Sequence, residues 1–440
     1  MNLNIDYQTL EKITQGKLFG KGVLHCLTTD SRKVQKDMAF WVLKGQKYDG
    51  HTFVPVALKQ GANLIISHTF VKEAPACLVV KDTLKALQAL AKYHRQQNKL
   101  EIACMTGSNG KSTTKQMLFA LLSYKGQTRA NLGNLNNQIG VPLSLLEILP
   151  QDKYGVFELG ASHKGDIDEI ASLALPKVAI LTNIAPAHLE FFKTLQGVFE
   201  TKTEILKYIS SDGTLVYNLD DEYLKTLKQN YKKKSLSYGF SKDADLQILE
   251  QETFAFKYQG QIYKSSLVLQ SHNKLNAAAA SLGALALGLK PEEIIEALKN
   301  YQPMALRLEE KTKHGVKFIL DCYNANPASM QNALNILAAR KENNKAVVLG
   351  DMRELGEESV KYHRDLARQI LALKIKKVFL VGPFMKEAFN ILAQEPSVMV
   401  KYALETKDII EPLRQELKDI SIVLVKASNS LNFESIFKEI

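Results

Sequence analysis

Short apolar runs alternate with longer amphipathic segments along most of the chain, and this alternation predicts an α/β protein. From residue 100 onward the apolar runs have strand length and the segments between them have helical periodicity, which is typical of a parallel sheet covered by helices. The predicted strands are 102–107, 154–161, 177–184 and 213–221, and the predicted helices are 112–124, 166–173 and 195–209. The alternation restarts after residue 303, with strands at 316–323, 345–352, 376–382, 399–403 and 420–428 and helices at 328–341, 357–373, 384–393 and 406–418. It predicts a second doubly wound domain there.

Two further regions have patterns of their own. The first 95 residues mix short apolar runs with helical patterns at 52–60 and 83–97, which indicates a small α/β domain. Between 235 and 270 the chain alternates apolar and polar positions on both sides of a glycine, as in an antiparallel hairpin. An alanine-rich helix follows at 274–287, with Ser271 as its N-cap. The predicted domains are therefore 1–97, 98–303 and 304–440.

Composition and charge argue against a nucleic-acid-binding, a disulfide-rich or a membrane-spanning protein. The chain has 440 residues, 45% of them hydrophobic, and a formal net charge of +11. The lysines are dispersed and form no basic stripe with interleaved aromatic residues, so we expect a small polyanionic substrate and no nucleic acid. The four cysteines form no CxxC pair, and no apolar run reaches the ~18 residues of a membrane span. We expect a cytoplasmic protein with reduced cysteines and no membrane insertion.

Residues 104–115, CMTGSNGKSTTK, end an apolar run in a glycine-bounded loop. Glycines let backbone N–H groups converge on a phosphate, the following helix directs its positive end there, Lys111 supplies charge and Ser112 can reach Mg²⁺. The spacing differs from a Walker A loop, because Met105 stands where that pattern needs a glycine. A plain glycine turn between strand and helix is the alternative.

Polar residues at strand ends are the next candidates, because ligands of doubly wound sheets collect there. Glu158 is an acid inside an apolar strand, which either caps a sheet edge or holds a metal, and His188 follows the next strand, where a structural loop histidine is the alternative. Lys202 shares a predicted helix face with apolar residues, and snorkelling to solvent is the alternative. Asp321 and Asp351 each end a strand, and either could instead cap a helix.

Amide side chains crowd two other segments. Four asparagines between residues 131 and 137 exceed the needs of one turn, which indicates sugar or phosphate recognition or, alternatively, a plain loop. Asn276 lies at the start of the alanine-rich helix, where it either faces a purine or completes the helix cap. Arg307 lies just after the predicted boundary of the last domain.

Taken jointly, these segments resemble the Mur ligases, ATP-dependent enzymes that form amide bonds in peptidoglycan synthesis, over the whole chain. The resemblance rests on TGSNGKSTTK, NLNNQIGVPLSLL, ELGASHKGDI, TNIAPAHLE, DCYNANPASM and LGDMRELGEE. The short TGxxGK(S/T)T loop of that family explains the missing glycine. The resemblance implies an α/β protein of three domains: a small UDP-binding domain, a central P-loop ATPase domain with a parallel sheet, and a C-terminal Rossmann-like domain.

The resemblance also implies site roles. Lys111, Lys202, His188 and Glu158 would be catalytic. ATP would contact Gly107, Ser108, Asn109, Gly110, Lys111, Ser112, Thr113, Asn276, Arg307 and Asp321. Mg²⁺ would occupy two sites, one held by Ser112 and Glu158 and one by His188 and Lys202. The lysine that matches Lys202 is N-carboxylated in the family, which turns a cation into an oxygen ligand.

The implied reaction joins D-alanyl-D-alanine to UDP-N-acetylmuramoyl-tripeptide through an acyl phosphate, because YNANP and LGDMRELG resemble the members that add this dipeptide. Substrate contacts would come from Ser31, Arg32, Asp49, Asn134, Asn137, Asn324, Asn326, Asp351 and Lys426. Two positions depart from the family. Asn429 replaces a usual arginine, so Lys426 should carry more of the dipeptide recognition, and Leu320 replaces a usual aspartate, which leaves Asp321 without an acidic neighbour. We expect a monomer. The alternatives are a sister Mur ligase, a folylpolyglutamate synthase or a P-loop protein without ligase chemistry, and the third residue of the tripeptide is left open between lysine and diaminopimelate.

Overall fold

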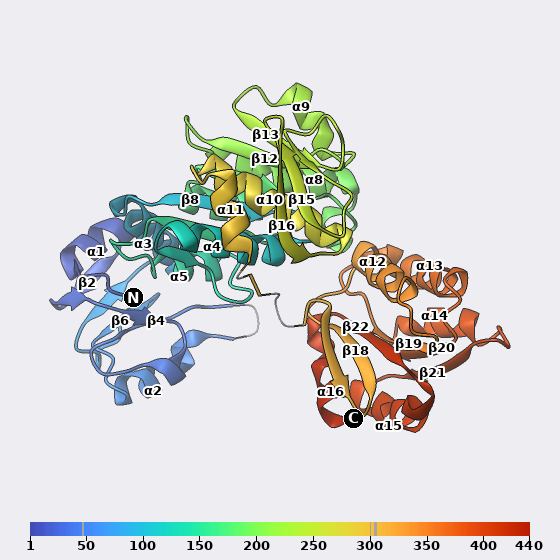
Figure 1. Ribbon diagram of the computed structural model, residues 1–440. Coiled ribbons are helices and arrows are strands. Elements are labelled where there is room, and N and C mark those ends of the chain that lie inside the picture. The colour runs from blue at the N-terminus through green and yellow to red at the C-terminus, as the bar shows by residue number, and fades with distance from the viewer. Residues whose placement is uncertain (46–47, 300, 303–305) are drawn as a thin grey trace. The chain divides into compact units, whose positions relative to one another are not determined.

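The computed structural model describes residues 1–45, 48–299, 301–302 and 306–440 (Figure 1). The chain divides into two compact units: Met1–Thr182 with Thr201–Asn300, called the first unit here, and Asn183–Glu200 with Tyr301–Ile440, called the second unit. The predicted α/β class is confirmed, because both units contain parallel sheets covered by helices. The predicted domain boundary at residues 303 and 304 lies outside the described residues.

The N-terminal part of the first unit is built on a five-stranded sheet, in the order β2-β7-β6-β5-β4, beside a two-stranded ribbon of β1 and β3, among the described residues. Its central strands β5 and β6 are fully buried, as their apolar runs predict. Asp82 caps the long helix α3 by accepting a hydrogen bond from the Lys85 backbone N–H. The elements are β1 Ile5–Asp6, α1 Tyr7–Thr14, β2 Lys17–Phe19, β3 Val23–Leu24, β4 Leu27–Thr28, β5 Ala39–Trp41, α2 Val54–Lys59, β6 Leu64–Ser67, β7 Cys77–Val79 and α3 Thr83–Gln97.

A nine-stranded sheet forms the rest of the first unit, in the order β16-β15-β14-β13-β12-β11-β8-β10-β9 within the described chain. Strands β9 to β13 and β8 pair in parallel, whereas β14, β15 and β16 pair antiparallel to one another. The strands are β8 Glu101–Thr106, β9 Thr128–Ala130, β10 Tyr154–Glu158, β11 Val178–Leu181, β12 Thr214–Asn218, β13 Ser235–Gly239, β14 Leu246–Ile248, β15 Thr253–Tyr258 and β16 Gln261–Val268. The helices are α4 Lys111–Lys125, α5 Gly140–Leu145, α6 Asp166–Ala174, α9 Leu227–Asn230, α10 Ser271–Ala286 and α11 Pro291–Leu298, together with the end of α8 Leu195–Thr203, whose residues up to Glu200 belong to the second unit.

The predicted antiparallel hairpin is present and its turn explains why it forms. Gln259 and Gly260 both have positive φ, 49° and 83°, which is the backbone of a type I′ turn. The helix after it begins earlier than predicted. Ser271 is its first residue and Gln270 is the N-cap, so the assignment of Ser271 as N-cap is wrong.

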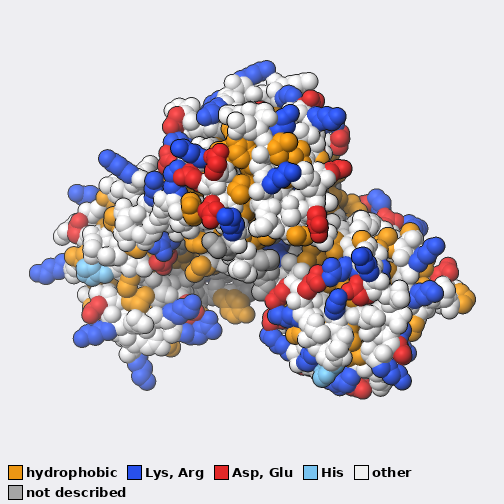
Figure 2. Space-filling model, in the orientation of Figure 1, with side chains coloured by type: hydrophobic (Ala, Val, Ile, Leu, Met, Phe, Trp, Pro, Cys, Tyr) orange, Lys and Arg blue, Asp and Glu red, His pale blue; other side chains and the backbone are white. Residues whose placement is uncertain are grey.

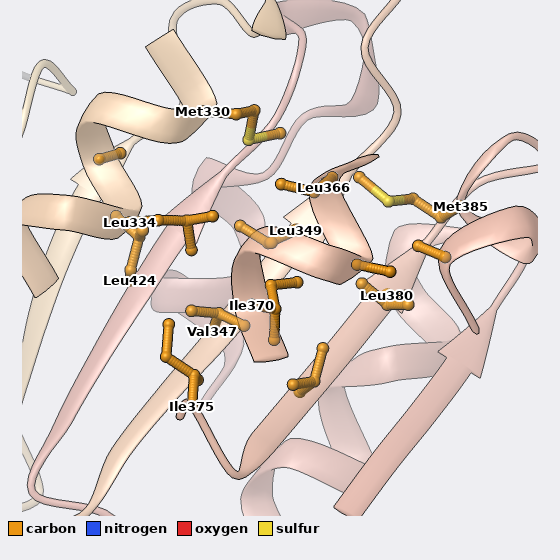
Figure 3. Close-up of a cluster of buried hydrophobic side chains, with 14 of the residues drawn as sticks. Met330, Leu334, Val347, Leu349, Leu366, Ile370, Ile375, Leu380, Met385 and Leu424 are labelled. Carbon is orange, nitrogen blue, oxygen red and sulfur yellow. The ribbon is translucent and has the colours of Figure 1, made fainter. Parts of the chain in front are cut away.

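The second unit has a six-stranded sheet, in the order β17-β18-β22-β19-β20-β21 in the described residues. Helices cover both faces, so alternate residues of one strand enter different cores: Phe318 and Leu320 pack on one side and Ile319 on the other. Figure 3 shows the core in which side chains of α12, α13 and α14 meet those of the sheet. The elements are α7 Leu189–Phe192, β17 Glu309–Lys313, β18 Val316–Asp321, α12 Pro327–Ala338, β19 Lys345–Gly350, α13 Ser359–Ala372, β20 Lys377–Val381, α14 Met385–Leu392, β21 Met399–Ala403, α15 Thr406–Glu416, β22 Ile422–Lys426 and α16 Glu434–Glu439.

Charged side chains of both signs are distributed over the face drawn in Figure 2. Figure 2 shows lysine and arginine side chains scattered over the visible face and mixed with acidic ones, without a continuous basic stripe on that face. None of the helices in the described ranges is both long and apolar enough to cross a membrane.

Candidate active site

The glycine-bounded loop connects the C-terminal end of β8, which lies between β11 and β10 in the nine-stranded sheet, to the start of α4. Gly107 and Gly110 have φ of 147° and 81°, which lets the chain reverse within four residues. The Lys111 ammonium donates to the carbonyl oxygens of Gly107 at 2.7 Å and Ser108 at 3.0 Å. Thr182, which the sequence reasoning missed, donates its hydroxyl to the Asn109 carbonyl at 2.6 Å and fixes the far side of the loop.

Helix α10 packs directly against this loop. A Cβ added to Gly110 would lie 2.3 Å from Oδ1 of Asn276, so the helix and the loop touch at a position that admits only glycine. Asn276 is 8% exposed, and its Oδ1 also accepts a hydrogen bond from the Thr114 hydroxyl at 3.4 Å. Asn276 therefore lies against the loop, as a nucleotide-binding role requires.

Glu158 is the acidic centre of the first unit. It ends β10 and pairs in register with Met105 of β8, which places it beside the start of the loop. Its side chain is nearly inaccessible and accepts hydrogen bonds from the Ser112 hydroxyl at 2.7 Å and from Nδ2 of Asn136 at 2.8 Å. The oxygens of Ser112 and Glu158 thus converge at the first turn of α4, and oxygen donors are the ligands that Mg²⁺ prefers. Both residues fit that ion.

No group of three or more His, Cys, Asp and Glu side chains that could hold a metal occurs in the described part of the chain. A metal at Glu158 would therefore need other kinds of donor, such as a hydroxyl, a modified lysine, a phosphate or water. Mg²⁺ ordinarily keeps several waters and takes only one or two carboxylates from a protein, so this composition suits it.

The asparagine-rich segment 131–137 lies on Glu158. Asn131 is buried, with its Oδ1 accepting from the Glu158 backbone N–H at 3.0 Å and its Nδ2 donating to the Glu158 carbonyl at 3.0 Å. Oδ1 of Asn137 accepts from the N–H of Gly140, the first residue of α5, at 2.9 Å. Asn134 is exposed. The amides of Asn131 and Asn136 thus support Glu158, whereas Asn134 and Asn137, the two predicted to bind substrate, make no hydrogen bond to it among the described contacts.

Lys202 is almost entirely buried on α8. Its exposed fraction is 2%, and Nζ donates to the Ala161 carbonyl at 3.4 Å. Burial, together with the nearby Lys111 cation, lowers its pKa to about 7. The alternative of a snorkelling lysine is excluded, because the side chain turns inward. Near pH 7 a large share of this amine is neutral and nucleophilic.

The predicted substrate residues of the N-terminal part lie in two short turns. Asp30 accepts from the Arg32 backbone and guanidinium, with side-chain distances of 2.9 and 2.8 Å, and the Arg32 hydrogen bond lowers the Asp30 pKa to about 2. Ser31 begins the same 3-10 turn. Asp49 caps the second turn by accepting from the His51 N–H at 3.0 Å, and His51 lowers its pKa to about 2. Both acids thus shape turns and remain ionised.

In the second unit, Asp321 and Lys426 end neighbouring parallel strands in register. The Lys426 ammonium lies 2.6 Å from Oδ2 of Asp321 and 2.8 Å from the Asn324 carbonyl, and the lysine is 1% exposed. The charge predicted to hold a dipeptide carboxylate is therefore already paired with Asp321. Lys426 thus ties the end of β22 to the end of β18 and to the loop that follows β18.

Two other predicted substrate residues have structural partners. Asn326 caps α12, accepting from the Ser329 N–H at 2.9 Å. Asp351 is 2% exposed and accepts from the Met385 N–H at 2.9 Å, which holds the start of α14. Burial raises the pKa of Asp351. His363, 3.9 Å away, accepts from the Met352 N–H at 3.1 Å and steadies the same loop.

Arg307 and His188 each have a partner that sequence reasoning missed. The Arg307 guanidinium lies 4.0 Å from the ring centre of Tyr323, a cation–π contact. Nδ1 of His188 lies 2.5 Å from Oε2 of Glu354, and this contact lowers the pKa of the Glu354 carboxyl group. His188 belongs to the second unit, whereas Ser112, Glu158 and Lys202 belong to the first.

Three family models match the chain. The model described as Mur ligase family, catalytic domain, matches residues 23–95; Mur ligase middle domain matches 105–284; and Mur ligase, glutamate ligase domain, matches 306–429. The chain is 33% identical over 429 residues to the UDP-N-acetylmuramoyl-tripeptide--D-alanyl-D-alanine ligase of Bacillus subtilis (strain 168), covering 95% of this chain and 93% of the relative.

Solved structures match over almost the whole length. A crystal structure of MurF from Acinetobacter baumannii aligns with a TM-score of 0.91 at 31% identity, covering 99% of this chain and 98% of that one. MurF from Thermotoga maritima, solved in complex with ADP, aligns with a TM-score of 0.83 at 28% identity, covering 94% of this chain and 96% of that one.

Proposed function

Because the chain belongs to the Mur ligase family, we propose that it is an ATP-dependent ligase, which joins D-alanyl-D-alanine to the free carboxylate of UDP-N-acetylmuramoyl-tripeptide. The observation that carries this proposal is the loop 107–110, followed at once by Lys111 and by Ser112 in contact with Glu158. The relative solved in complex with ADP supports nucleotide binding by this chain. The reaction yields ADP, phosphate and a new amide.

The positive charge around the start of α4 explains how the site would bind the phosphates of ATP. The N-terminal turn of α4 presents backbone N–H groups, and Lys111 adds a positive charge, so a triphosphate placed there is stabilised. Mg²⁺ held by Ser112 and Glu158 would supply charge neutralisation on the transferring phosphoryl group. Asn276 of α10 lies against the loop and would contact a nucleotide bound there.

Lys202 would act after conversion to its carbamate. The neutral amine adds to the carbon of CO₂ and loses a proton, and a pKa of about 7 keeps the neutral amine available at physiological pH. The product is an anion with two oxygens, which suits a second Mg²⁺ site better than an ammonium does.

The acceptor carboxylate attacks the γ-phosphoryl group and forms an acyl phosphate, with ADP as the leaving group. The amine of D-alanyl-D-alanine then attacks the acyl carbon, phosphate leaves, and a proton is released from the new amide nitrogen. The chain's part in both steps is to hold the reactants in line and to keep charge balanced around Lys111. We place the enzyme in the cytoplasm, where UDP-linked precursors are made, and expect a monomer.

The test is phosphate release from ATP with Mg²⁺, measured with UDP-N-acetylmuramoyl-tripeptide and D-alanyl-D-alanine added separately and together. A ligase of this kind releases phosphate steadily only when both are present, and mass spectrometry then shows the UDP-linked pentapeptide. Phosphate release that ignores either substrate, or no release with both, would refute the proposal.

A further inference from the structure

Lys115 lies on α4 one turn after Lys111, and the reaction described above does not use it. The side chain is 5% exposed, and Nζ donates to the carbonyl oxygen of Asn131 at 2.7 Å and of Gly133 at 3.3 Å. Burying an ammonium is costly unless hydrogen bonds compensate it. Two backbone carbonyls of one loop provide those bonds, so Lys115 ties α4 to the start of segment 131–137.

The same segment is tied to β10 by a different set of bonds. The Asn131 side chain makes two hydrogen bonds with the backbone of Glu158, both at 3.0 Å. Nζ of Lys115 is itself 4.0 Å from Oε2 of Glu158. Lys115, Asn131 and Glu158 thus form a closed triangle that joins the phosphate-loop helix, the asparagine-rich segment and the acidic strand end.

The far end of the segment is held just as closely. Nδ2 of Asn136 donates to Oε1 of Glu158 at 2.8 Å, and the Gly160 N–H donates to the Asn136 carbonyl at 2.7 Å. A Cβ on Gly160 would lie 2.8 Å from Oδ1 of Asn136, so the amide packs directly on the backbone there. Both ends of the segment are therefore fixed to the end of β10, and its middle, with Asn134 and Leu132, is exposed.

We propose that Lys115 is a positioning residue that couples occupation of the phosphate loop to binding of the UDP-linked muramoyl peptide at segment 131–137. Lys111 and Ser112, which face the nucleotide phosphates, share a rigid helix with Lys115, so a shift of the helix start on nucleotide binding is transmitted to the Asn131 and Gly133 carbonyls. The exposed amides of the segment suit the hydroxyls and amides of a sugar-linked peptide. The inference rests on the proposed function and deepens it.

The test compares the wild type with Lys115→Met and with Lys125→Met, a matched control at the other end of α4 whose lysine pairs with Glu293. Calorimetry gives the affinity of a non-hydrolysable ATP analogue with Mg²⁺, alone and with saturating UDP-N-acetylmuramoyl-tripeptide. We expect the peptide to change nucleotide affinity about tenfold in the wild type and in Lys125→Met, and to leave it almost unchanged in Lys115→Met. Lys115→Arg, which keeps the cation, should restore part of the coupling.

Hydrogen exchange gives a second readout that needs no ligand. In Lys115→Met, amides of residues 131–137 should exchange faster, while those in the second half of α4 keep their protection. If Lys115→Met is too unstable to purify, Lys115→Gln serves in both measurements. Equal coupling in Lys115→Met and wild type, no coupling in the wild type, or unchanged exchange of 131–137 would each overturn the inference. Steady turnover with unaltered coupling overturns only this inference, whereas failure of the muramoyl peptide to bind overturns the proposed function as well.

Discussion

Replacement of Lys202 tests the most unusual electrostatic feature of the first unit. The pKa of this buried lysine falls from 10.5 to about 7, first because burial penalises the ammonium and second because Lys111 is nearby. At pH 7 an ordinary lysine is neutral in roughly one molecule in 3,000, whereas a pKa of about 7 makes about half of the molecules neutral. The supply of reactive amine is thus greater on the order of a thousandfold, which favours carbamate formation at this lysine over exposed ones.

The assay is ¹³C NMR of the protein in buffer with labelled bicarbonate. We expect one carbamate resonance in the wild type, its absence in Lys202→Met, and its retention in Lys274→Met, a control at another lysine buried in the first unit. Phosphate release should be lost in Lys202→Ala and partly restored by a short carboxylate, which replaces the missing oxygen ligand. Removal of dissolved CO₂ should lower the activity of the wild type.

The lowered pKa of Lys202 determines how the rate of carbamate formation should depend on pH. At fixed dissolved CO₂, the rate of carbamate formation should rise about tenfold per pH unit below pH 7, where the amine is mostly protonated. It should level off above pH 7, because the amine is then mostly neutral. A rate that continues to rise toward pH 10 would mean that Lys202 titrates like an exposed lysine. That profile, or activity that is indifferent to CO₂, would refute the reasoning.

Three other predictions concern single contacts. Gly110→Ala adds a Cβ at positive φ against the side-chain oxygen of α10 and should weaken ATP binding at least tenfold by calorimetry, whereas Gly288→Ala, at φ 85° with open space, should not. Tyr323→Leu removes the ring beneath Arg307, a cation–π contact worth about 0.5–2 kcal/mol, so the free energy of unfolding should fall by about that amount in chemical denaturation. Tyr323→Phe should keep the wild-type value, and equal stabilities of the two variants would contradict the role. Burial lowers the pKa of His94, so as the pH falls below 6.5 the histidine takes up a proton in the unfolded chain before it does so in the folded protein. The free energy of unfolding should therefore fall by up to about 1.4 kcal/mol per pH unit. Chemical denaturation at several pH values should show a smaller fall in His94→Gln.

The periodicity of the sequence predicted most of the fold because buried parallel strands are nearly continuous apolar runs. The strand 399–403 and the helix 83–97 have the predicted bounds, and the hairpin around Gly260 pairs as expected. The strand β17, Glu309–Lys313, was missed because its sequence EEKTK contains no apolar residue. It is an edge strand held by backbone pairing with β18, and hydropathy carries no signal for such a strand.

The grouping of Asn183–Glu200 with the C-terminal residues was also beyond sequence reasoning. That segment makes contacts with residues more than 150 positions later, such as the ion pair of His188 with Glu354 and the hydrogen bond from the Glu190 N–H to the Glu354 carbonyl. The hydrophobic pattern of a segment predicts whether that segment forms a helix or a strand. It does not predict which distant part of the chain a loop packs against.

The rule that ligands collect at strand ends selects polar residues of two different kinds, and only their partners separate them. Glu158 ends the apolar strand β10, Asp351 directly follows the apolar strand β19, and both are 2% exposed. Asp351 accepts from a backbone N–H that starts a helix, whereas Glu158 accepts from the hydroxyl and amide side chains of Ser112 and Asn136. The Met385 N–H is fixed in the backbone and needs Asp351 as its acceptor, whereas the Ser112 and Asn136 side chains can rotate away from Glu158 when a cation binds. Glu158 can therefore exchange its partners for a metal, and Asp351 cannot do so without releasing the start of α14.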